Sequence, residues 1–339
     1  MDGLIVSSDA NISYLTGSPS RDSKLLISKN KNVYFTDSRY ITAAKKALGS
    51  KFIIKKVKHS FAKIIAETCA ELKLETVGFE DRALSVAEHR HLQKEFSHRH
   101  RLEPVPCSGL VESLREIKDA QEIENIRQSL AITALALKFA QEIILPGRKE
   151  LEIVGELERF IRYHGAEKAA FEIIVASGPN SAYPHHLPTQ RKIKENEPVM
   201  IDIGVDYLGY KSDLTRVFFL GKMDALARRI YNIVTEAQKR AIKKIKPGVE
   251  ISQIDAAARD FIAQKGYAKY FGHALGHGVG LETHEAPNIS PNNHGRLKPG
   301  MVFTVEPAIY LPGKFGIRIE DMVLVTRKGA EVLSGTINQ

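Results

Sequence analysis

The sequence predicts an α/β domain followed by an α+β domain. A chain of 339 residues is longer than one hydrophobic core usually serves, so two domains are expected. Short apolar runs alternate with helical patterns through residues 1–107, which is typical of an α/β unit. The rest of the chain reads as long helices followed by strands and glycine-rich turns, which predicts an α+β arrangement.

The first domain is expected to contain four strands and three helices. Each segment repeats its apolar residues with the period of a strand or of a helix. In chain order we expect a strand at 24–28, a strand at 32–36, a helix at 38–48, a strand at 52–57, a helix at 60–74, a strand at 76–80 and a helix at 85–96.

A breaker-rich stretch follows these elements. Residues 104–110 contain two prolines and a glycine, and the segment 112–124 is highly charged. Gly and Pro are the strongest local punctuators of secondary structure, so we place the domain boundary near residue 115. The predicted domains are therefore residues 1–115 and residues 116–339.

A long amphipathic pattern opens the second domain. Ile123, Ile126, Leu130 and Leu135 are expected on one face of a helix at 119–143, which ends before a proline–glycine pair. The other predicted elements are a helix at 150–165, a buried strand at 171–177, helices near 223–244 and 251–265, and then strands with tight turns.

Composition excludes several classes of protein. Hydrophobic content of 43% and charged content of 26% are ordinary for a globular protein. No run approaches the roughly 18 to 20 apolar residues that a membrane-spanning helix needs. The N-terminus lacks the basic region of a signal peptide, and two cysteines outside any CxxC motif indicate a reducing compartment. We therefore expect a cytoplasmic protein without a membrane partner.

The net charge of +9 is partly local, in the segment 89–101. A basic cluster can bind phosphate backbones, but aromatic residues are sparse here, so a solvated helix face is favoured and no nucleic-acid partner is expected. No carboxylate-rich framework surrounds the histidines of this segment, so we expect no metal site there. These histidines are His89, His91, His98 and His100.

Four acidic residues stand in or beside apolar runs of the second domain. Asp202 ends an apolar strand and Asp213 follows 11 residues later; Glu306 ends a similar strand and Glu320 follows 14 residues later. Buried charges must be paired or bound to metal. Two similar halves that face each other would bring the four carboxylates to one point.

Four clustered carboxylates require cations. Acids held close repel one another, and some stay protonated unless a cation neutralises them. Two divalent ions balance four negative charges. Oxygen ligands with one imidazole, from His277, suit Mn²⁺, Co²⁺, Fe²⁺ or Zn²⁺, and the predominance of carboxylates favours Mn²⁺. A water between two such ions becomes a nucleophile, which indicates a hydrolase.

Further histidines accompany the acids. His273, His277 and His284 lie in a segment at 272–287 whose glycines argue against a helix and allow close approach of chain and ligand. His185 lies in a proline-bounded loop. Histidines can stabilise charge that develops on a carbonyl oxygen, and no GxSxG motif supports an acyl-enzyme route, so the pattern favours direct amide hydrolysis.

At these residues the sequence resembles the pita-bread metallopeptidases, which include aminopeptidase P, prolidase and methionine aminopeptidase. The resemblance covers most of the chain. The matching motifs are 201-IDIG-204, 212-SDLTRVF-218, 273-HALGHGVGLETHE-285, 300-GMVFTVEPAIY-310 and 316-GIRIED-321.

The resemblance implies a role for each residue. Asp213 and Glu320 would bridge two metal ions, and Glu306, also a ligand, would shuttle a proton. The implied metal ligands are Asp202, Asp213, His277, Glu306 and Glu320; the implied catalytic histidines are His185 and His284; His273 would line the pocket, with Tyr310 and Arg318 as supports around the substrate. Two residues depart from the family pattern: Ala308, where glycine is usual, and His186, in a place often held by glycine.

The N-terminal part resembles the creatinase-type domain of the proline-specific members, through 11-NISYLTG-17 and 36-TDSRY-40. This implies short peptides with proline in the second position as substrates, and a homodimer. The pita-bread fold is thus expected at residues 116–339, after a creatinase-like domain at 1–115.

Several functions compete. Some prolidases carry an arginine shortly after the His–Glu pair, where this chain has Asn288, so we favour an Xaa-Pro aminopeptidase over an Xaa-Pro dipeptidase. A metal-free amidinohydrolase of the creatinase kind would need the ligands replaced, and none is. A non-enzymatic adaptor of the same fold is a more distant alternative, because adaptors typically lose ligands.

Overall fold

Residues 1–107 fold as the alternating pattern predicts, around one mixed six-stranded sheet. The computed structural model describes residues 1–99 and 102–335, and the chain divides into two compact units, Met1–Leu114 and Arg115–Gln339. The sheet of the first unit has the order β4-β3-β2-β1-β5-β6. Its strands are β1 (Gly3–Val6), β2 (Ser23–Ser28), β3 (Val33–Thr36), β4 (Ile53–Lys56), β5 (Thr76–Glu80) and β6 (Glu103–Cys107).

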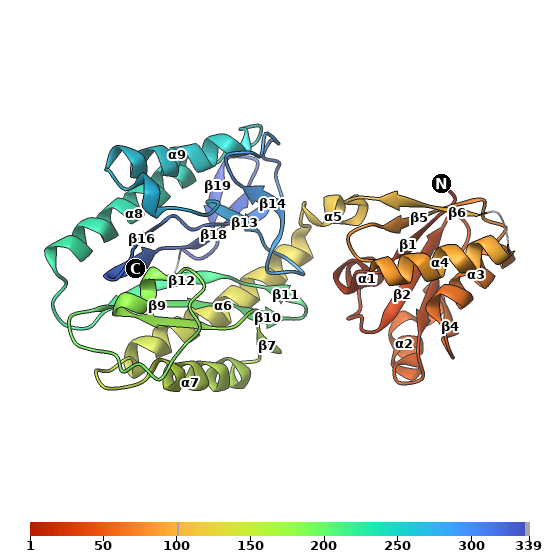
Figure 1. Cartoon of the computed structure of the whole chain (residues 1–339), viewed down its shortest axis with the longest axis horizontal. Coiled ribbons are helices and arrows are strands. Elements are labelled where there is room, and N and C mark those ends of the chain that lie inside the picture. The colour runs from red at the N-terminus through yellow and green to blue at the C-terminus, as the bar shows by residue number, and fades with distance from the viewer. Residues whose placement is uncertain (100–101, 336–339) are drawn as a thin grey trace. The chain divides into compact units, whose positions relative to one another are not determined.

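Helices cover both faces of this sheet (Figure 1). Alternate residues of each strand point to opposite faces, so Phe35 belongs to one core and Tyr34 to the other. The first core includes residues of α3 and α4, and the second includes residues of α1 and α2. The helices are α1 (Asp9–Thr16), α2 (Ile41–Leu48), α3 (Phe61–Glu71), α4 (Val86–Arg99) and α5 (Leu110–Arg115), with a 3₁₀ turn η1 (Gly49–Lys51).

Two strands of this sheet escaped the sequence analysis. The first is β1, a four-residue strand that pairs antiparallel with β2 and parallel with β5. The second is β6, which lies in the stretch whose prolines predict a break in secondary structure. Pro104 and Pro106 pair with β5 because β6 is an edge strand, where a missing N–H can face outward.

The basic segment behaves as a solvated helix face over its described part. Leu92 and Phe96 of α4 are buried, whereas Arg90, His91 and Lys94 are exposed. His100 lies outside the described residues. Within residues 1–99 and 102–335, no helix has the length and apolar character that crossing a bilayer requires.

The second unit is built from two similar halves, each a helix pair followed by strands (Figure 1). In each half, a short hairpin interrupts an antiparallel strand pair: β10 and β11 lie between β9 and β12, and β16 and β17 lie between β15 and β18. This topology agrees with the two similar halves expected from the sequence. It also confirms an α+β arrangement.

The first half contains α6 (Ala120–Ile143), α7 (Glu150–Tyr163), β7 (Lys168–Ala169), β8 (Ile174–Ser177), η2 (Gly178–Ala182), β9 (Pro198–Ile203), β10 (Val205–Tyr207), β11 (Tyr210–Lys211) and β12 (Leu214–Phe219). The second half contains α8 (Ala225–Lys244), α9 (Ile251–Gln264), η3 (Ala268–Tyr270), β13 (Gly276–Gly278), β14 (Glu285–Ile289), β15 (Val302–Val305), β16 (Ala308–Leu311), β17 (Phe315–Arg318), β18 (Asp321–Val325) and β19 (Ala330–Val332).

Helix α6 begins where its sequence predicts. The Asp119 carboxylate accepts hydrogen bonds from the N–H groups of Gln121 and Glu122, and the Glu122 carboxylate accepts one from the N–H of Asp119, which completes a capping box. Its buried face includes Ile126 and Leu130. The placement of Leu135 on that face is wrong: it is 47% exposed, because five residues after Leu130 the helix has turned by about 140°.

The strand predicted at 171–177 is shorter than expected. Only β8 pairs with β9, from Ile174 opposite Asp202 to Ser177 opposite Val199. The ladder stops there because β9 ends at Ile203, after which the chain turns at Gly204 into β10.

The turn at Gly204 requires glycine for lack of space. A Cβ atom there would lie 1.9 Å from the carbonyl oxygen of Ser212. Gly204→Ala should therefore lower the free energy of unfolding by about 1–3 kcal/mol through overpacking, measured by urea denaturation. Gly155→Ala is the matched control, since nothing lies within 4 Å of its Cβ in α7, and it should stabilise by about 0.5–1 kcal/mol. Equal stability of Gly204→Ala and wild type would contradict the close approach.

Candidate metal centre

The first pair of acids lies on the β9–β12 strand pair. Asp202 is on β9 directly opposite Thr215 of β12, and Asp213 immediately precedes β12. Both acids are at most 9% exposed. The charge of Asp202 is among the causes that raise the pKa of Asp213, so the two carboxylates face the same space. The hairpin-like connection expected between them is present as β10 and β11.

The second pair of acids lies on the β15–β18 strand pair. Glu306 directly follows β15, and Glu320, which is 1% exposed, directly precedes β18. Thr304 donates a hydrogen bond from Oγ1 to the Glu306 carboxylate at 3.1 Å. Thr215, from the other strand pair, donates one to the Glu320 carboxylate at 2.6 Å. The two halves therefore meet at their acids.

His277 completes the cluster from β13. Its Nδ1 lies 3.1 Å from the Gly278 carbonyl, which can only accept, so Nδ1 carries the proton and Nε2 of the neutral ring presents a lone pair. Nε2 lies 3.3 Å from Glu306 and 3.7 Å from Asp213. Ligand atoms of Asp213, His277 and Glu320 all lie within 4.8 Å of one another, a group that could hold a metal ion.

The strand that carries His277 approaches its neighbour closely. A Cβ atom at Gly276 would lie 1.9 Å from the Thr304 carbonyl oxygen, so β13 reaches β15 only because residue 276 is glycine. The N–H of His277 donates to Oγ1 of Thr304 at 3.0 Å. The segment is a strand and turn, as the glycines indicated, and not a helix.

Burial and mutual repulsion raise the pKa values of three of the acids. Burial, then the charge of Glu320, raises the pKa of Asp213 well above its usual range. Burial, then the charge of Glu306, does the same to the pKa of Glu320. Burial raises the pKa of Glu306 to about 7. Burial, with the nearby His284, lowers the pKa of His277 to about 4, so this imidazole is neutral at pH 7.

Arg318 is the cation that the chain itself supplies, and it is 2% exposed. It donates from Nη2 to Asp202 at 2.6 Å, from Nε to Thr215 at 3.0 Å, and from Nη1 to the Tyr310 hydroxyl at 2.7 Å. Tyr310 in turn lies 3.2 Å from Nε2 of His273. One guanidinium thus joins the acids to the pocket residues predicted from the sequence.

The other predicted histidines lie beside the cluster. The ring centroids of His277 and His284 are 4.1 Å apart. Burial, then His185, lowers the pKa of His284. Burial lowers the pKa of His273 to about 4, and the charge of His185 contributes. His185 itself lies in the turn after η2 and is exposed. His284 therefore lies against His277, and His185 lies near enough to His273 and His284 to influence both.

These residues fit divalent cations. Among the described residues, Asp202 Oδ1 has no hydrogen-bond partner although it is buried, which is costly unless a ligand meets it. The lone pair of His277 Nε2 faces carboxylate oxygens, an arrangement that favours an intervening cation. Raised carboxyl pKa values are also what excess buried negative charge produces.

Sequence reasoning missed the residues that hold the site in place. Thr215 and Thr304 orient Glu320 and Glu306, and the signal was a threonine inside an apolar strand beside an acid. Glu285, next to His284, pairs with Lys118 at 2.7 Å and with Arg115 at 2.5 Å; all three side chains are at most 6% exposed. No local signal indicates such a pair, because its members are about 170 residues apart.

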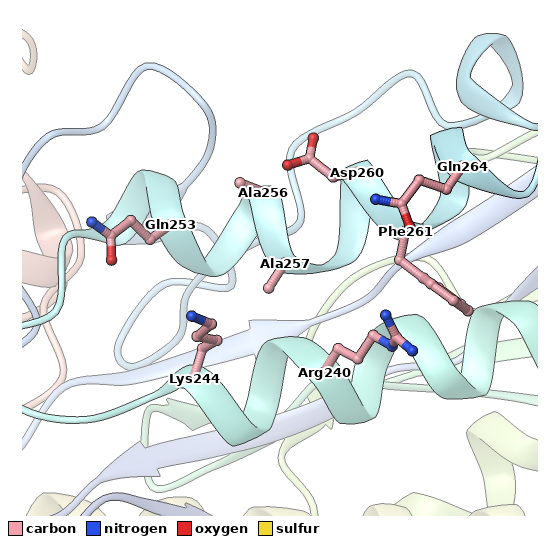
Figure 2. Close-up of a pocket in the computed structure, with 8 residues that line it drawn as sticks. All are labelled: Arg240, Lys244, Gln253, Ala256, Ala257, Asp260, Phe261 and Gln264. Atoms are coloured by element: carbon pink, nitrogen blue, oxygen red, sulfur yellow. The ribbon is translucent and has the colours of Figure 1, made fainter.

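Figure 2 shows a pocket of about 310 Å³ between α8 and α9 that carries none of the predicted site residues. The Arg240 guanidinium lies 4.0 Å from the centre of the Phe261 ring, so a cation–π contact forms part of its lining. The lining residues are Arg240, Lys244, Gln253, Ala256, Ala257, Asp260, Phe261 and Gln264. It has no cluster of carboxylates and histidines, so the acid cluster remains the candidate site.

Comparison with known families assigns the chain. Residues 124–327 match the model of metallopeptidase family M24, and residues 1–117 match the creatinase/prolidase N-terminal domain. The chain belongs to metallopeptidase family M24. This confirms the predicted pita-bread family and its creatinase-type N-terminal part. An M24 metallopeptidase uses divalent metal ions, so the acid cluster is the natural place for them.

Several known proteins resemble this M24 chain. It is 45% identical over 227 residues to an Xaa-Pro dipeptidase of Pyrococcus furiosus, a match that covers 67% of this chain and 65% of that protein. The structure of an Xaa-Pro dipeptidase from Bacillus anthracis matches with a TM-score of 0.93 and 38% identity, over 98% of this chain and 92% of the other. An X-Pro aminopeptidase from Thermotoga maritima matches with a TM-score of 0.90 and 38% identity, over 98% and 95%.

The raised carboxyl pKa values predict pH-dependent metal affinity. Glu306, with a pKa near 7, holds a proton at pH 6 that a metal ion must displace, and burial with neighbouring acids shifts the pKa values of Asp213 and Glu320 in the same direction. His277 is already neutral between pH 6 and 8 and adds no dependence there. Calorimetric titration of the metal-free protein with Mn²⁺ should show an affinity at least about tenfold weaker at pH 6 than at pH 8, with proton release. Equal affinities at the two pH values would contradict this reading.

Proposed function

We propose that this M24 metallopeptidase is an Xaa-Pro dipeptidase, which hydrolyses the bond between an N-terminal residue and proline. The observation that carries the proposal is the structural similarity over almost the whole chain to an Xaa-Pro dipeptidase, combined with a group of Asp213, His277 and Glu320 that could hold a metal ion. Xaa-Pro aminopeptidase activity on longer peptides is the second candidate.

The comparisons change the order that the sequence favoured. Asn288, in place of an arginine after the His–Glu pair, led us to prefer the aminopeptidase. The relatives named Xaa-Pro dipeptidase support the other choice better, although the Thermotoga maritima structure carries the aminopeptidase name. A single position on β14 is weak evidence, because a free substrate carboxylate can be held from elsewhere in a pocket.

The proposed metal site holds two divalent ions, of which Mn²⁺ is favoured by the predominance of carboxylates. Asp213 and Glu320 would be shared by both ions, as the family resemblance implies, and their ligand atoms lie within 4.8 Å of each other and of His277. Asp202 would use the buried oxygen that Arg318 leaves unbonded. The proposed ligands are Asp202, Asp213, His277, Glu306 and Glu320.

The chemistry is direct hydrolysis. Bound divalent ions supply Lewis acidity, which makes water more acidic and polarises a carbonyl group. Glu306 takes the proton from the attacking water and delivers it to the proline nitrogen as the amide C–N bond breaks. Its Oε1 is oriented for this by the Thr304 hydroxyl. His284 and His185 donate hydrogen bonds to the carbonyl oxygen as its negative charge grows.

The pocket beyond the metal site is proposed to bind the peptide. His273, Tyr310 and Arg318 form one hydrogen-bonded chain beside Asp202 and would shape the space around the substrate. Residues 116–339 would thus carry the chemistry. Residues 1–115 are proposed to restrict access to short peptides and to take part in a homodimer, as the resemblance implies.

The setting of the protein is also a proposal. Cys69 and Cys107 are both free, which supports a cytoplasmic, reducing environment. Aromatic residues are sparse in the basic segment 89–101, and Phe96 of α4 is buried, which supports the absence of a nucleic-acid partner. The intact acid cluster argues against both the creatinase-type reaction and an adaptor role.

Replacement of Asp213 tests the metal site. Asp213→Asn keeps the size of the side chain but removes one ligand charge, and it should lower kcat/KM more than about a hundredfold. The metal-free variant should be at least as stable as the metal-free wild type, because one repelling buried charge is gone. The control is Asp260→Asn, an exposed position on α9 that should leave activity unchanged. Wild-type activity of Asp213→Asn with saturating Mn²⁺ would refute the dinuclear site.

Substrate length separates the two candidate activities. The Mn²⁺-loaded protein should hydrolyse Ala-Pro with a kcat/KM at least about tenfold above that for Ala-Pro-Ala, with Ala-Ala as the control that lacks proline. A preference for Ala-Pro-Ala would identify an aminopeptidase. No cleavage of any Xaa-Pro peptide would favour the adaptor.

A further inference from the structure

Glu150, the first residue of α7, accepts hydrogen bonds from several residues of the loop that carries His185. Its carboxylate is completely buried. Oε1 accepts hydrogen bonds from the N–H and hydroxyl of Ser177 at 2.8 and 2.7 Å. Oε2 accepts from the N–H and hydroxyl of Thr189 at 3.0 and 2.7 Å, and from Nε2 of His186 at 3.0 Å. One carboxylate thus ties both ends of segment 177–189 to α7.

His186 is the donor that the family pattern does not lead us to expect, because glycine is usual at its position. A carboxylate accepts, so the imidazole Nε2 carries the proton and donates. The His186 side chain is 9% exposed. Burial raises the pKa of Glu150, but hydrogen bonds from His186, Ser177 and Thr189 outweigh burial and hold the pKa below its usual value. The contact is therefore a buried, charge-assisted hydrogen bond.

A second anchor holds the other flank of the same turn. The carbonyl oxygen of Pro184 accepts a hydrogen bond from Nη1 of Arg318 at 3.1 Å. The same guanidinium holds Asp202 at 2.6 Å. His185 stands between these anchors, with one neighbour bonded to the arginine of the acid cluster and the other to Glu150. Among the described residues, no side-chain hydrogen bond holds the exposed ring of His185, so its position depends on the backbone of the turn.

We propose that His186 is a positioning residue that, through Glu150, fixes the turn 184–186 so that His185 faces the acid cluster beside His273 and His284. A glycine at residue 186 cannot make this bond, so this chain adds an anchor that the usual pattern lacks. The catalytic consequence rests on the proposed peptidase function, whereas the ordering of the turn does not.

The test uses three substitutions in the full-length protein. His186→Phe keeps a ring in the same space but removes the donor. His186→Gln keeps an N–H donor and serves as the rescue. His294→Phe is the matched control, because His294 also contacts a glutamate, Glu250, at 2.7 Å, but its side chain is 76% exposed.

Hydrogen exchange measured by mass spectrometry reports the ordering directly. Amides of residues 183–189 should exchange at least about tenfold faster in His186→Phe than in wild type, and at the wild-type rate in His186→Gln and His294→Phe. Unchanged exchange in His186→Phe would overturn the proposal. This readout needs no substrate, so it decides the anchor even if the protein hydrolyses no Xaa-Pro peptide.

Kinetics report the consequence for catalysis. With Ala-Pro, His186→Phe should lower kcat about tenfold with little change in KM, because a misplaced group costs rate at the reacting centre, and His186→Gln should restore most of it. Loss of thermal stability with unchanged kcat per folded molecule would show a purely structural role and overturn the proposal. If wild type is inactive on all Xaa-Pro peptides, the proposed function fails while the exchange result still stands.

Discussion

The charge balance at the centre of the second unit depends on one guanidinium placed among four carboxylates. Arg318 is almost completely buried and divides its donors among Asp202, Thr215, Tyr310 and the backbone of Pro184. It offsets one negative charge of four. The remaining excess raises the carboxyl pKa values and makes the folded metal-free chain electrostatically costly, since desolvated like charges repel. Metal ions are therefore part of what this architecture is built to hold.

The rest of the fold brings those charges together. Two antiparallel strand pairs, each interrupted by a hairpin, end at the same place, and each contributes two acids. Two apolar cores pack against these strands: one joins α6 and α7 to strands of both halves, including β15 and β18, and the other is centred on α8 and α9. Because apolar burial in these two cores stabilises the unit, the polar centre can remain unfavourable without unfolding it. Gly204 and Gly276 permit the close strand contacts that this requires.

Around the acids, three of the histidines are neutral rings, and that of His277 presents the lone pair of Nε2 to the acid cluster. Burial lowers the pKa values of His273, His277 and His284, so these rings are neutral when the acids bind metal. His185 differs, because it is exposed and lies on a loop. Its orientation depends on partners on either side, which is why Glu150 and Arg318 matter to a residue that neither of them touches in the hydrogen-bond network.

The sequence by itself indicated the residues of the proposed site, because acids inside apolar strands and glycine-spaced histidines leave a local pattern. It also determined most helices, through their period and the capping box at Asp119. It missed the edge strand β6, whose prolines resemble a linker until a neighbour is known. Only the tertiary structure decided that Thr215 orients Glu320 and that His186 meets Glu150, because these partners lie 105 and 36 residues apart. Such contacts depend on how strands and loops pack together, so the local sequence around each residue does not indicate its partner.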